Sequence, residues 1–163
     1  MFLKLTIPKN VSKELDSVLP GSTSRFTKVH SKSFHLSILY VGKNSDKKKG
    51  EILSNVETVC RNQPLLQARL GGIGYFRLMD DSVVTYASVN SPGLDLLRAN
   101  LFMAVNPVCQ IPNTYGFNAH VTLYNGQAPV GIINKLPSIS WTFEGIRVCS
   151  ELETYVPFNS QLI

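Results

Sequence analysis

Two short segments of this chain repeat the same order of residue types, each with a histidine two positions before a hydroxyl side chain. They are His35-Leu36-Ser37-Ile38 and His120-Val121-Thr122-Leu123. Imidazole titrates near neutral pH, so one histidine can act as a base while another acts as an acid. The two hydroxyls can donate hydrogen bonds to phosphate oxygens and stabilise charge that develops there. Four such groups around one cleft would suit cleavage of a phosphodiester without a metal ion.

Both segments are rich in β-favouring residues, and each is followed within a few positions by Tyr and Gly. This composition predicts two strands. Side chains two positions apart on a strand share a face, so each histidine shares a face with its hydroxyl residue. The aliphatic neighbours take the other face and are assigned to the core. A single strand histidine of this kind is common and usually structural; the repetition of the whole pattern favours catalysis.

The rest of the chain predicts the elements that must hold these two strands. Alternating or β-branched runs indicate strands at residues 2–7, 65–70, 82–89 and 139–148, and residues 150–163 offer an edge strand. Helical spacing of apolar residues indicates helices at 12–19, around 52–60 and between Pro92 and Pro107, with a short helix or turn at 129–136. Residues 21–33 are expected to form a loop or a loosely paired strand.

Local signals also predict how these elements begin and end. Caps are expected at Ser12, at Ser45 or Asp46, and at Ser91, with Pro107 closing the long helix. The segment Gly71-Gly72-Ile73-Gly74 lacks the helix that would follow a phosphate-binding loop, so it is interpreted as a bend or bulge. Asp80-Asp81 is expected to form a turn.

Composition restricts the classes of protein without identifying one. The 163 residues are 44% hydrophobic and 17% charged, which suits one globular domain. The net charge of +5 is compatible with an anionic partner and equally with none. Three widely spaced cysteines indicate reduced thiols in the cytoplasm and no zinc site, and the longest apolar runs are too short to cross a membrane.

The repeated segments resemble the two-histidine (2H) phosphoesterase superfamily. Its members include LigT-like RNA phosphodiesterases, cyclic phosphodiesterases and viral 2′,5′-phosphodiesterases, and its signature is His-x-Thr-Leu or His-x-Ser, present twice. Residues 2–7, 65–76 and 141–152 fit the remainder of the family pattern less specifically. Ala119 stands where the family often has proline before the second histidine, and the first segment has Ser37 in place of threonine. Neither difference removes a reacting group.

The resemblance implies an α+β fold, a single bilobal domain over residues 1–163. Its two intertwined lobes, related by a pseudo-twofold axis, would place two antiparallel sheets around a V-shaped groove with helices outside. It also implies that His35 and His120 are the catalytic pair and that Ser37 and Thr122 bind phosphate. No metal or cofactor is expected. Which histidine is the base, and whether water or a ribose hydroxyl attacks, stay open.

The implied substrates carry a phosphate on a ribose 2′-oxygen: a 2′,3′-cyclic phosphate, a 2′,5′-linked oligoadenylate or a cyclic oligonucleotide signal. The small size also resembles compact viral or phage members that destroy immune nucleotides. We expect a cytoplasmic monomer. Aromatic rings favour unstacked nucleobases, and the candidates for base stacking are Tyr40, Phe76, Tyr115 and Tyr124. Candidates for additional phosphate contacts are Lys4, Arg25 and Arg77, whereas His30 is expected in a loop.

Three other functions compete with this one. A non-catalytic module that binds RNA ends or nucleotides would not need two titratable groups. A metallohydrolase would need further carboxylates or histidines near the pair. A serine nucleophile at Ser37 would need the Gly-x-Ser-x-Gly turn, which is absent around it.

Overall fold

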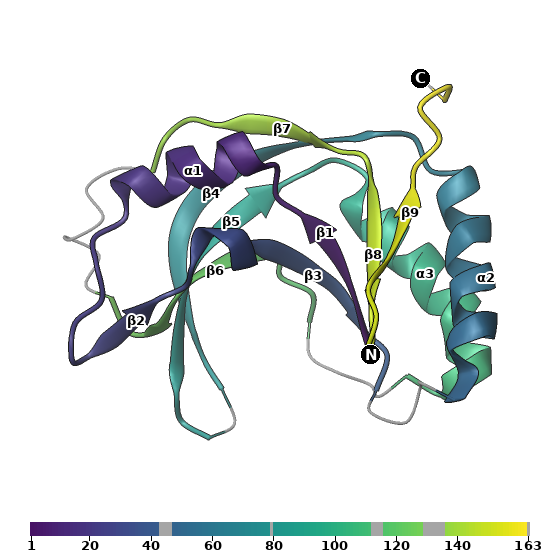
Figure 1. The fold of residues 1–163 in the computed structure, drawn as a ribbon, viewed down its shortest axis with the longest axis horizontal. Helices are drawn as coiled ribbons and strands as arrows, with labels where there is room; N and C mark the ends of the chain where they lie inside the picture. Colours follow the sequence, from purple (N-terminus) through teal and green to yellow (C-terminus); the bar gives the residue numbers. More distant parts are fainter. Residues whose placement is uncertain (43–46, 79, 112–115, 129–135, 163) are drawn as a thin grey trace.

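The structure is a computed structural model that describes residues 1–42, 47–78, 80–111, 116–128 and 136–162. Its strands form two antiparallel sheets (Figure 1). The four-stranded sheet has the order β3-β1-β8-β9, with β3 His35–Tyr40, β1 Phe2–Thr6, β8 Gly145–Cys149 and β9 Thr154–Pro157. The five-stranded sheet has the order β2-β6-β5-β4-β7, with β2 Phe26–Lys28, β6 His120–Gly126, β5 Val83–Asn90, β4 Leu66–Arg77 and β7 Ser140–Phe143.

Each sheet combines strands from both ends of the chain, so the two layers are intertwined. Helices α2, Lys49–Arg61, and α3, Leu94–Cys109, cover the four-stranded sheet (Figure 1). Helix α1, Lys9–Val18, lies on the side of the five-stranded sheet, and a 3₁₀ turn η1, Ser31–Ser33, leads into β3. The predicted α+β fold with two antiparallel sheets and outer helices is confirmed.

The aliphatic side chains of both repeated segments are buried, as the alternation predicted. Leu36, Val121 and Leu123 are fully buried, and Ile38 is nearly so. They join a core that includes the apolar stripes of α2 and α3, formed by Ile52, Val56, Leu97, Leu101 and Val105. Burial of one face of β3 and β6 leaves the opposite face, with the histidines, free for a site.

The run 139–148 is not the single strand that its alternation indicates. It divides at Glu144 into β7, which pairs with β4, and β8, which pairs with β1 and β9. The alternation changes phase at the break: Trp141 and Phe143 are buried in β7, whereas Ile146 and Val148 are buried in β8. Strand β8 begins at Gly145, a position that requires glycine because an added Cβ would lie 2.4 Å from the carbonyl oxygen of Val156.

The predicted helix caps are wrong where the structure describes them. Helix α1 begins at Lys9 after Pro8, so Ser12 lies inside the helix and is buried. Helix α2 has Lys48 at its N-cap; the expected caps Ser45 and Asp46 lie outside the described residues.

Helix α3 follows Gly93, whose φ of 84° favours glycine, and Ser91 supplies no side-chain cap. Pro107 also does not close this helix. It lies in the last turn, and the helix continues to Cys109. Proline lacks the backbone N–H, so Pro107 removes one helical hydrogen bond, and the helix can continue for two further residues.

The glycine segment after residue 70 contains the predicted bulge, yet the strand runs through it. The pairing of β4 with β5 shifts between Leu70 and Ile73, and β4 continues to Arg77. The turn at Asp80-Asp81 is confirmed, with Asp81 at a φ of 63°, and β9 is the expected edge strand. Residues 129–135, for which a short helix or turn was predicted, lie outside the described residues.

Candidate active site

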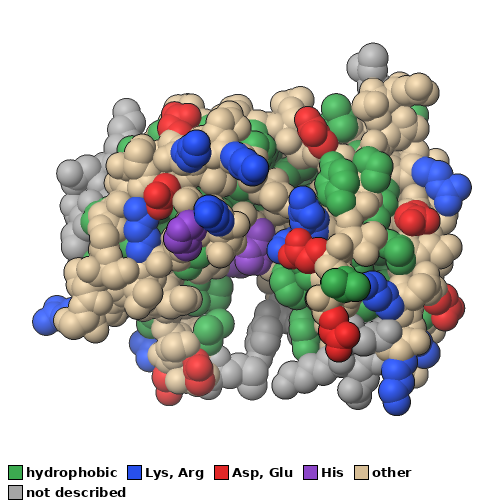
Figure 2. All heavy atoms as spheres, viewed as in Figure 1, with side chains coloured by type: hydrophobic (Ala, Val, Ile, Leu, Met, Phe, Trp, Pro, Cys, Tyr) green, Lys and Arg blue, Asp and Glu red, His purple; other side chains and the backbone are tan. Residues whose placement is uncertain are grey.

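The two repeated segments form neighbouring strands from different sheets. β3 is an edge strand of the four-stranded sheet, and its Cα atoms come within 8 Å of those of β6 in the five-stranded sheet. Both His35 and His120 begin their strands and are half-buried. Figure 2 shows one histidine side chain directly above a notch between the two halves of the molecule and another further to the left. The fold therefore brings the two distant segments to one region, which we call the groove.

The two imidazoles are held in the same way. His35 Nδ1 lies 2.7 Å from the carbonyl oxygen of Ser33, and His120 Nδ1 lies 2.6 Å from that of Asn118. A carbonyl oxygen only accepts, so each Nδ1 carries the proton and donates it. The neutral ring then has its lone pair on Nε2, and the charged ring has a second N–H there. Each histidine is thus oriented to exchange a proton through Nε2.

The two hydroxyl residues follow their histidines on the same strand faces. Ser37 is exposed and Thr122 is half-buried. Among the described residues, neither hydroxyl has a hydrogen-bond partner. An uncommitted hydroxyl can donate to a ligand without first breaking an internal bond. Both are therefore suited to bind an oxyanion in the groove.

Aromatic rings surround His120. The ring centroids of Phe76 and Tyr86 lie 5.1 Å and 5.2 Å from that of His120, and the two rings are 5.5 Å from each other. Tyr86 Oη accepts a hydrogen bond of 2.9 Å from Asn118 Nδ2. Since the Asn118 carbonyl also receives the His120 proton, Tyr86 supports the residue that orients His120. Tyr86 was not among the candidates predicted from the sequence, because its strand alternates normally and no local motif marks it.

The glycines of β4 make room for this arrangement. Gly74 pairs with Tyr86, and an added Cβ at Gly74 would lie 2.4 Å from Tyr86 Cζ. An added Cβ at Gly71 would lie 2.3 Å from Ser88 Oγ. Atoms do not approach so closely without displacement. The glycine segment therefore lets the groove side chains of β5 lie flat across β4.

Around His35 the neighbours come from β1. Thr6 pairs with His35, and Lys4 pairs with Ser37. Phe2 lies further along the same face, with its ring 6.0 Å from the His35 ring. Each histidine thus has an aromatic neighbour from an adjacent strand of its own sheet.

The four base-stacking candidates lie in different environments. Phe76 lies beside His120 as described, and Tyr40 is 43% exposed and pairs with Phe2 at the end of β3. Tyr124 is fully buried, its hydroxyl donates to the carbonyl of Pro20, and burial raises its pKa to about 12. The prediction for Tyr124 is wrong because the strand bulge opposite Thr85 turns this ring into the core. Tyr115 lies outside the described residues.

The basic candidates and the third histidine also lie in different parts of the structure. Lys4 faces the groove beside Ser37. Arg77 forms an exposed ion pair of 3.6 Å with Asp81 at the hairpin end, and Arg25 is exposed in the loop before β2. His30 lies in a loop, as expected, and its Nδ1 accepts from the backbone of Lys32 at the start of η1.

Two properties of the described residues bear on other classes of protein. Among these residues, no group of three or more His, Cys, Asp or Glu side chains gathers as a metal site would require. No helix in the same part of the chain is long and apolar enough to cross a membrane.

Comparison with solved structures defines the fold class. The chain is similar to TT0787 of Thermus thermophilus, with a TM-score of 0.72 and 21% identity over 97% of this chain and 94% of that one. It is similar to E. coli LigT complexed with 3′-AMP, with a TM-score of 0.66 and 18% identity over the same shares. A structure titled phosphoesterase gives a TM-score of 0.61 and 17% identity, again over 97% and 94%.

The protein therefore has the LigT-like fold over nearly its whole length, and the resemblance carried by its two motifs is confirmed at the level of the fold. No protein-family model matches the sequence, and no curated protein sequence matches it. The likeness is therefore one of structure, at sequence identities of 17% to 21%.

Proposed function

We propose that the protein is a metal-independent phosphodiesterase of the 2H type, acting on nucleotide or RNA phosphodiesters at a ribose 2′-oxygen. The observation that carries the proposal is the matched pair of imidazoles. Each is held through Nδ1 by a backbone carbonyl two residues earlier, and each is followed two residues later by a hydroxyl that has no partner among the described residues. That LigT, which shares this fold, has been crystallised with 3′-AMP, ATP, NADP⁺ and phosphate supports a nucleotide ligand.

In the proposed reaction one neutral imidazole removes the proton of the attacking oxygen through Nε2. The new P–O bond forms as the bond to the leaving oxygen breaks, and the second, charged imidazole gives that oxygen its proton. Ser37 and Thr122 donate to the non-bridging oxygens, where negative charge increases in the transition state. The carbonyls of Ser33 and Asn118 keep each ring in one tautomer throughout.

The test is turnover of a substrate panel in the presence of a chelator. The panel contains 2′,3′-cyclic AMP, an RNA ending in a 2′,3′-cyclic phosphate, a 2′,5′-linked triadenylate and a cyclic dinucleotide. We expect at least one member to be cleaved at an undiminished rate in chelator, because no step requires a metal ion. Absence of turnover for every member would overturn the proposal, and activity abolished by chelator would favour a metallohydrolase.

The same panel identifies the substrate class and separates the enzyme from a binding module. A module that only holds nucleotides or RNA ends would bind a panel member with micromolar affinity or better and release no product. Calorimetric titration alongside product analysis distinguishes the two results.

A further inference from the structure

The groove face of the four-stranded sheet carries a polar row that the acid–base scheme does not use. Strand register pairs Ser37 with Lys4, Lys4 with Arg147 and Arg147 with Tyr155. Residues directly opposite on neighbouring antiparallel strands point to the same face. The row therefore crosses all four strands, beginning two residues from His35.

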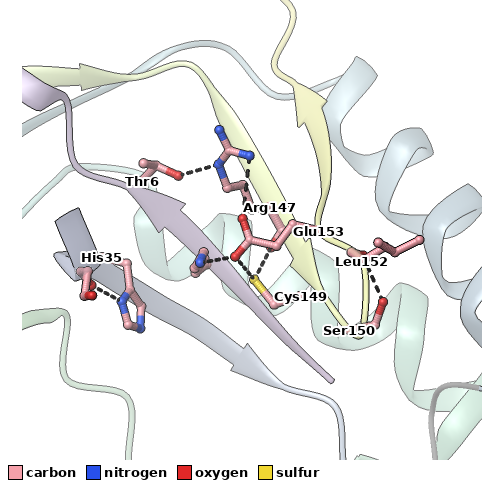
Figure 3. Close-up of polar contacts among 9 residues, drawn as sticks. Thr6, His35, Arg147, Cys149, Ser150, Leu152 and Glu153 are labelled. Carbon is pink, nitrogen blue, oxygen red and sulfur yellow. Dashed lines mark hydrogen bonds and ion pairs between the residues drawn. The ribbon is translucent and has the colours of Figure 1, made fainter.

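The guanidinium of Arg147 is held in a fixed position within this row. Its Nε donates to Thr6 Oγ1 at 3.0 Å, and its Cζ lies 5.5 Å from the centre of the Tyr155 ring. Nη1 lies 3.6 Å from a carboxylate oxygen of Glu153, which follows β8 in the chain (Figure 3). Lys4 forms a second ion pair with the same carboxylate. An arginine oriented in advance loses little freedom when it binds an anion.

The charges of this cluster do not cancel. Lys4 and Arg147 share the carboxylate of Glu153, so these three ion-paired groups together carry a net positive charge. Glu153 and Arg147 are partly exposed, with 44% and 38% of their side-chain surface open to solvent. Arginine and lysine bind phosphate through the same donors that bind carboxylate. Glu153 therefore occupies a position that a phosphate group could take.

We propose that Lys4, Arg147 and Tyr155 form a second nucleotide subsite, in which a phosphate next along the substrate from the reacting one binds to the two cations. This inference rests on the proposed function. Neighbouring strands are about 4.8 Å apart, so across the sheet Lys4 lies about 5 Å and Arg147 about 10 Å from Ser37. A phosphate held between these two cations is close enough to be the neighbour of the reacting one. The base of that nucleotide stacks on Tyr155, which is 45% exposed. The preferred substrate is then an oligonucleotide with at least two phosphates.

The experiment measures binding by calorimetric titration to protein made inactive by His120→Ala. The two ligands are a 2′,5′-linked triadenylate, which has two internucleotide phosphates, and 2′-AMP, which has one phosphate. We expect Arg147→Ala to weaken triadenylate binding by at least about tenfold, because a charge-assisted hydrogen bond is lost. The affinity for 2′-AMP should change by less than about twofold.

Three further variants sharpen the result. Arg147→Lys should recover part of the triadenylate affinity, since the charge remains while the two-pronged geometry is lost. Glu153→Gln should strengthen triadenylate binding about threefold by removing the competing carboxylate. Arg61→Ala, at the exposed end of α2, is the matched control and should change neither affinity. Melting temperatures confirm that each variant is folded.

The outcomes separate this inference from the proposed function. Equal weakening of both ligands by Arg147→Ala, no weakening of either, or no triadenylate binding by protein with Arg147 intact would each overturn the second subsite. The binding pattern expected above, in a protein that cleaves no panel member, would support the subsite and reject the phosphodiesterase.

Discussion

Asn118 joins Tyr86 to the catalytic candidate His120. The side-chain amide of Asn118 donates to Tyr86 Oη at 2.9 Å, and the backbone carbonyl of Asn118 accepts the His120 Nδ1 proton at 2.6 Å. The Tyr86 hydroxyl is the acceptor in this contact, and among the described residues its own proton has no acceptor. Tyr86 on β5 thereby supports the orientation of His120 on the adjacent strand β6.

Tyr86→Phe tests this relationship. Removal of the hydroxyl leaves the Asn118 amide without this acceptor and weakens the hold on His120, so kcat should fall about three- to tenfold with KM little changed. The limb of the pH–rate profile that reports His120 should shift. Tyr75→Phe is the control, because the Tyr75 hydroxyl donates to the backbone of Ala128 instead. A normal kcat and pH profile for Tyr86→Phe would show that Tyr86 has only a packing role.

Gly74→Ala tests whether the flat approach of Tyr86 to β4 matters for the site. The added methyl would lie 2.4 Å from Tyr86 Cζ and must displace the ring that contacts His120. We expect kcat/KM to fall at least about tenfold, since small misplacements near a reacting group are costly. Gly72→Ala is a close control, because nothing lies within 4 Å of its added Cβ. Equal activity of the two variants would contradict the expectation.

The three histidines provide a direct comparison of catalytic and structural roles. His35→Ala and His120→Ala should each lower kcat by at least about a hundredfold, because each removes one partner in proton transfer. The wild-type pH–rate profile should be bell-shaped, and each variant should lose one limb. His30→Ala, which removes only an exposed contact to Lys32, should keep nearly full activity. Retained activity in either of the first two variants would reject the acid–base pair.

Ser37→Ala and Thr122→Ala should each lower kcat/KM by about tenfold or more, because each removes one donor to the phosphate oxygens. Ser37→Thr and Thr122→Ser keep the hydroxyl and should recover most of the loss. Steady-state kinetics on the best panel substrate measure all four. Failure of the conservative variants to recover activity would mean that packing, rather than the hydroxyl, was lost.

Tyr124→Phe should affect stability and leave catalysis unchanged. The ring stays in the core, but the carbonyl of Pro20 loses its donor, so the free energy of unfolding should fall by about 1 kcal/mol. Urea denaturation measures this change, and kinetics on the same sample should match the wild type. A large rise in KM at normal stability would restore Tyr124 as a base-contacting residue.

Glu153 should make stability depend on pH in the acid range. The hydrogen bond from Lys4 is the main cause that holds the Glu153 pKa below its ordinary value. A carboxylate with a lowered folded-state pKa stabilises the fold above its ordinary pKa, and this contribution is lost as the pH falls through the lowered value. Glu153→Gln should therefore lower stability slightly at neutral pH and not at strongly acid pH. The effect is small because Glu153 is 44% exposed.

Urea denaturation at several pH values measures this difference. Glu151→Gln, at an exposed position two residues earlier, is the comparison variant and should leave the acid dependence nearly unchanged. A stability difference between Glu153→Gln and wild type that grows as the pH falls would contradict the expected sign.

The sequence by itself determined the two motif strands, their buried aliphatic faces and most of the order of strands and helices, whereas the α+β arrangement of two antiparallel sheets came from the family resemblance. The motif strands and their buried faces depend on local periodicity, which is complete within each segment, as Leu36 and Ile38 or Val121 and Leu123 show. The family resemblance supplied the pairing of the two segments. Helix caps failed at Ser12 and Ser91 because a cap depends on where the preceding chain enters, which local residue types do not specify.

Only the tertiary structure decided which other side chains belong to the groove. Strand register places Tyr86 beside His120, and in the other sheet it places Arg147 beside Lys4. Register depends on pairing between segments far apart in the chain. The division of 139–148 between two sheets and the burial of Tyr124 depend on the same kind of long-range pairing. In each case the buried positions shift by one residue, at Glu144-Gly145 and at Leu123-Tyr124, where the strand changes sheet or bulges.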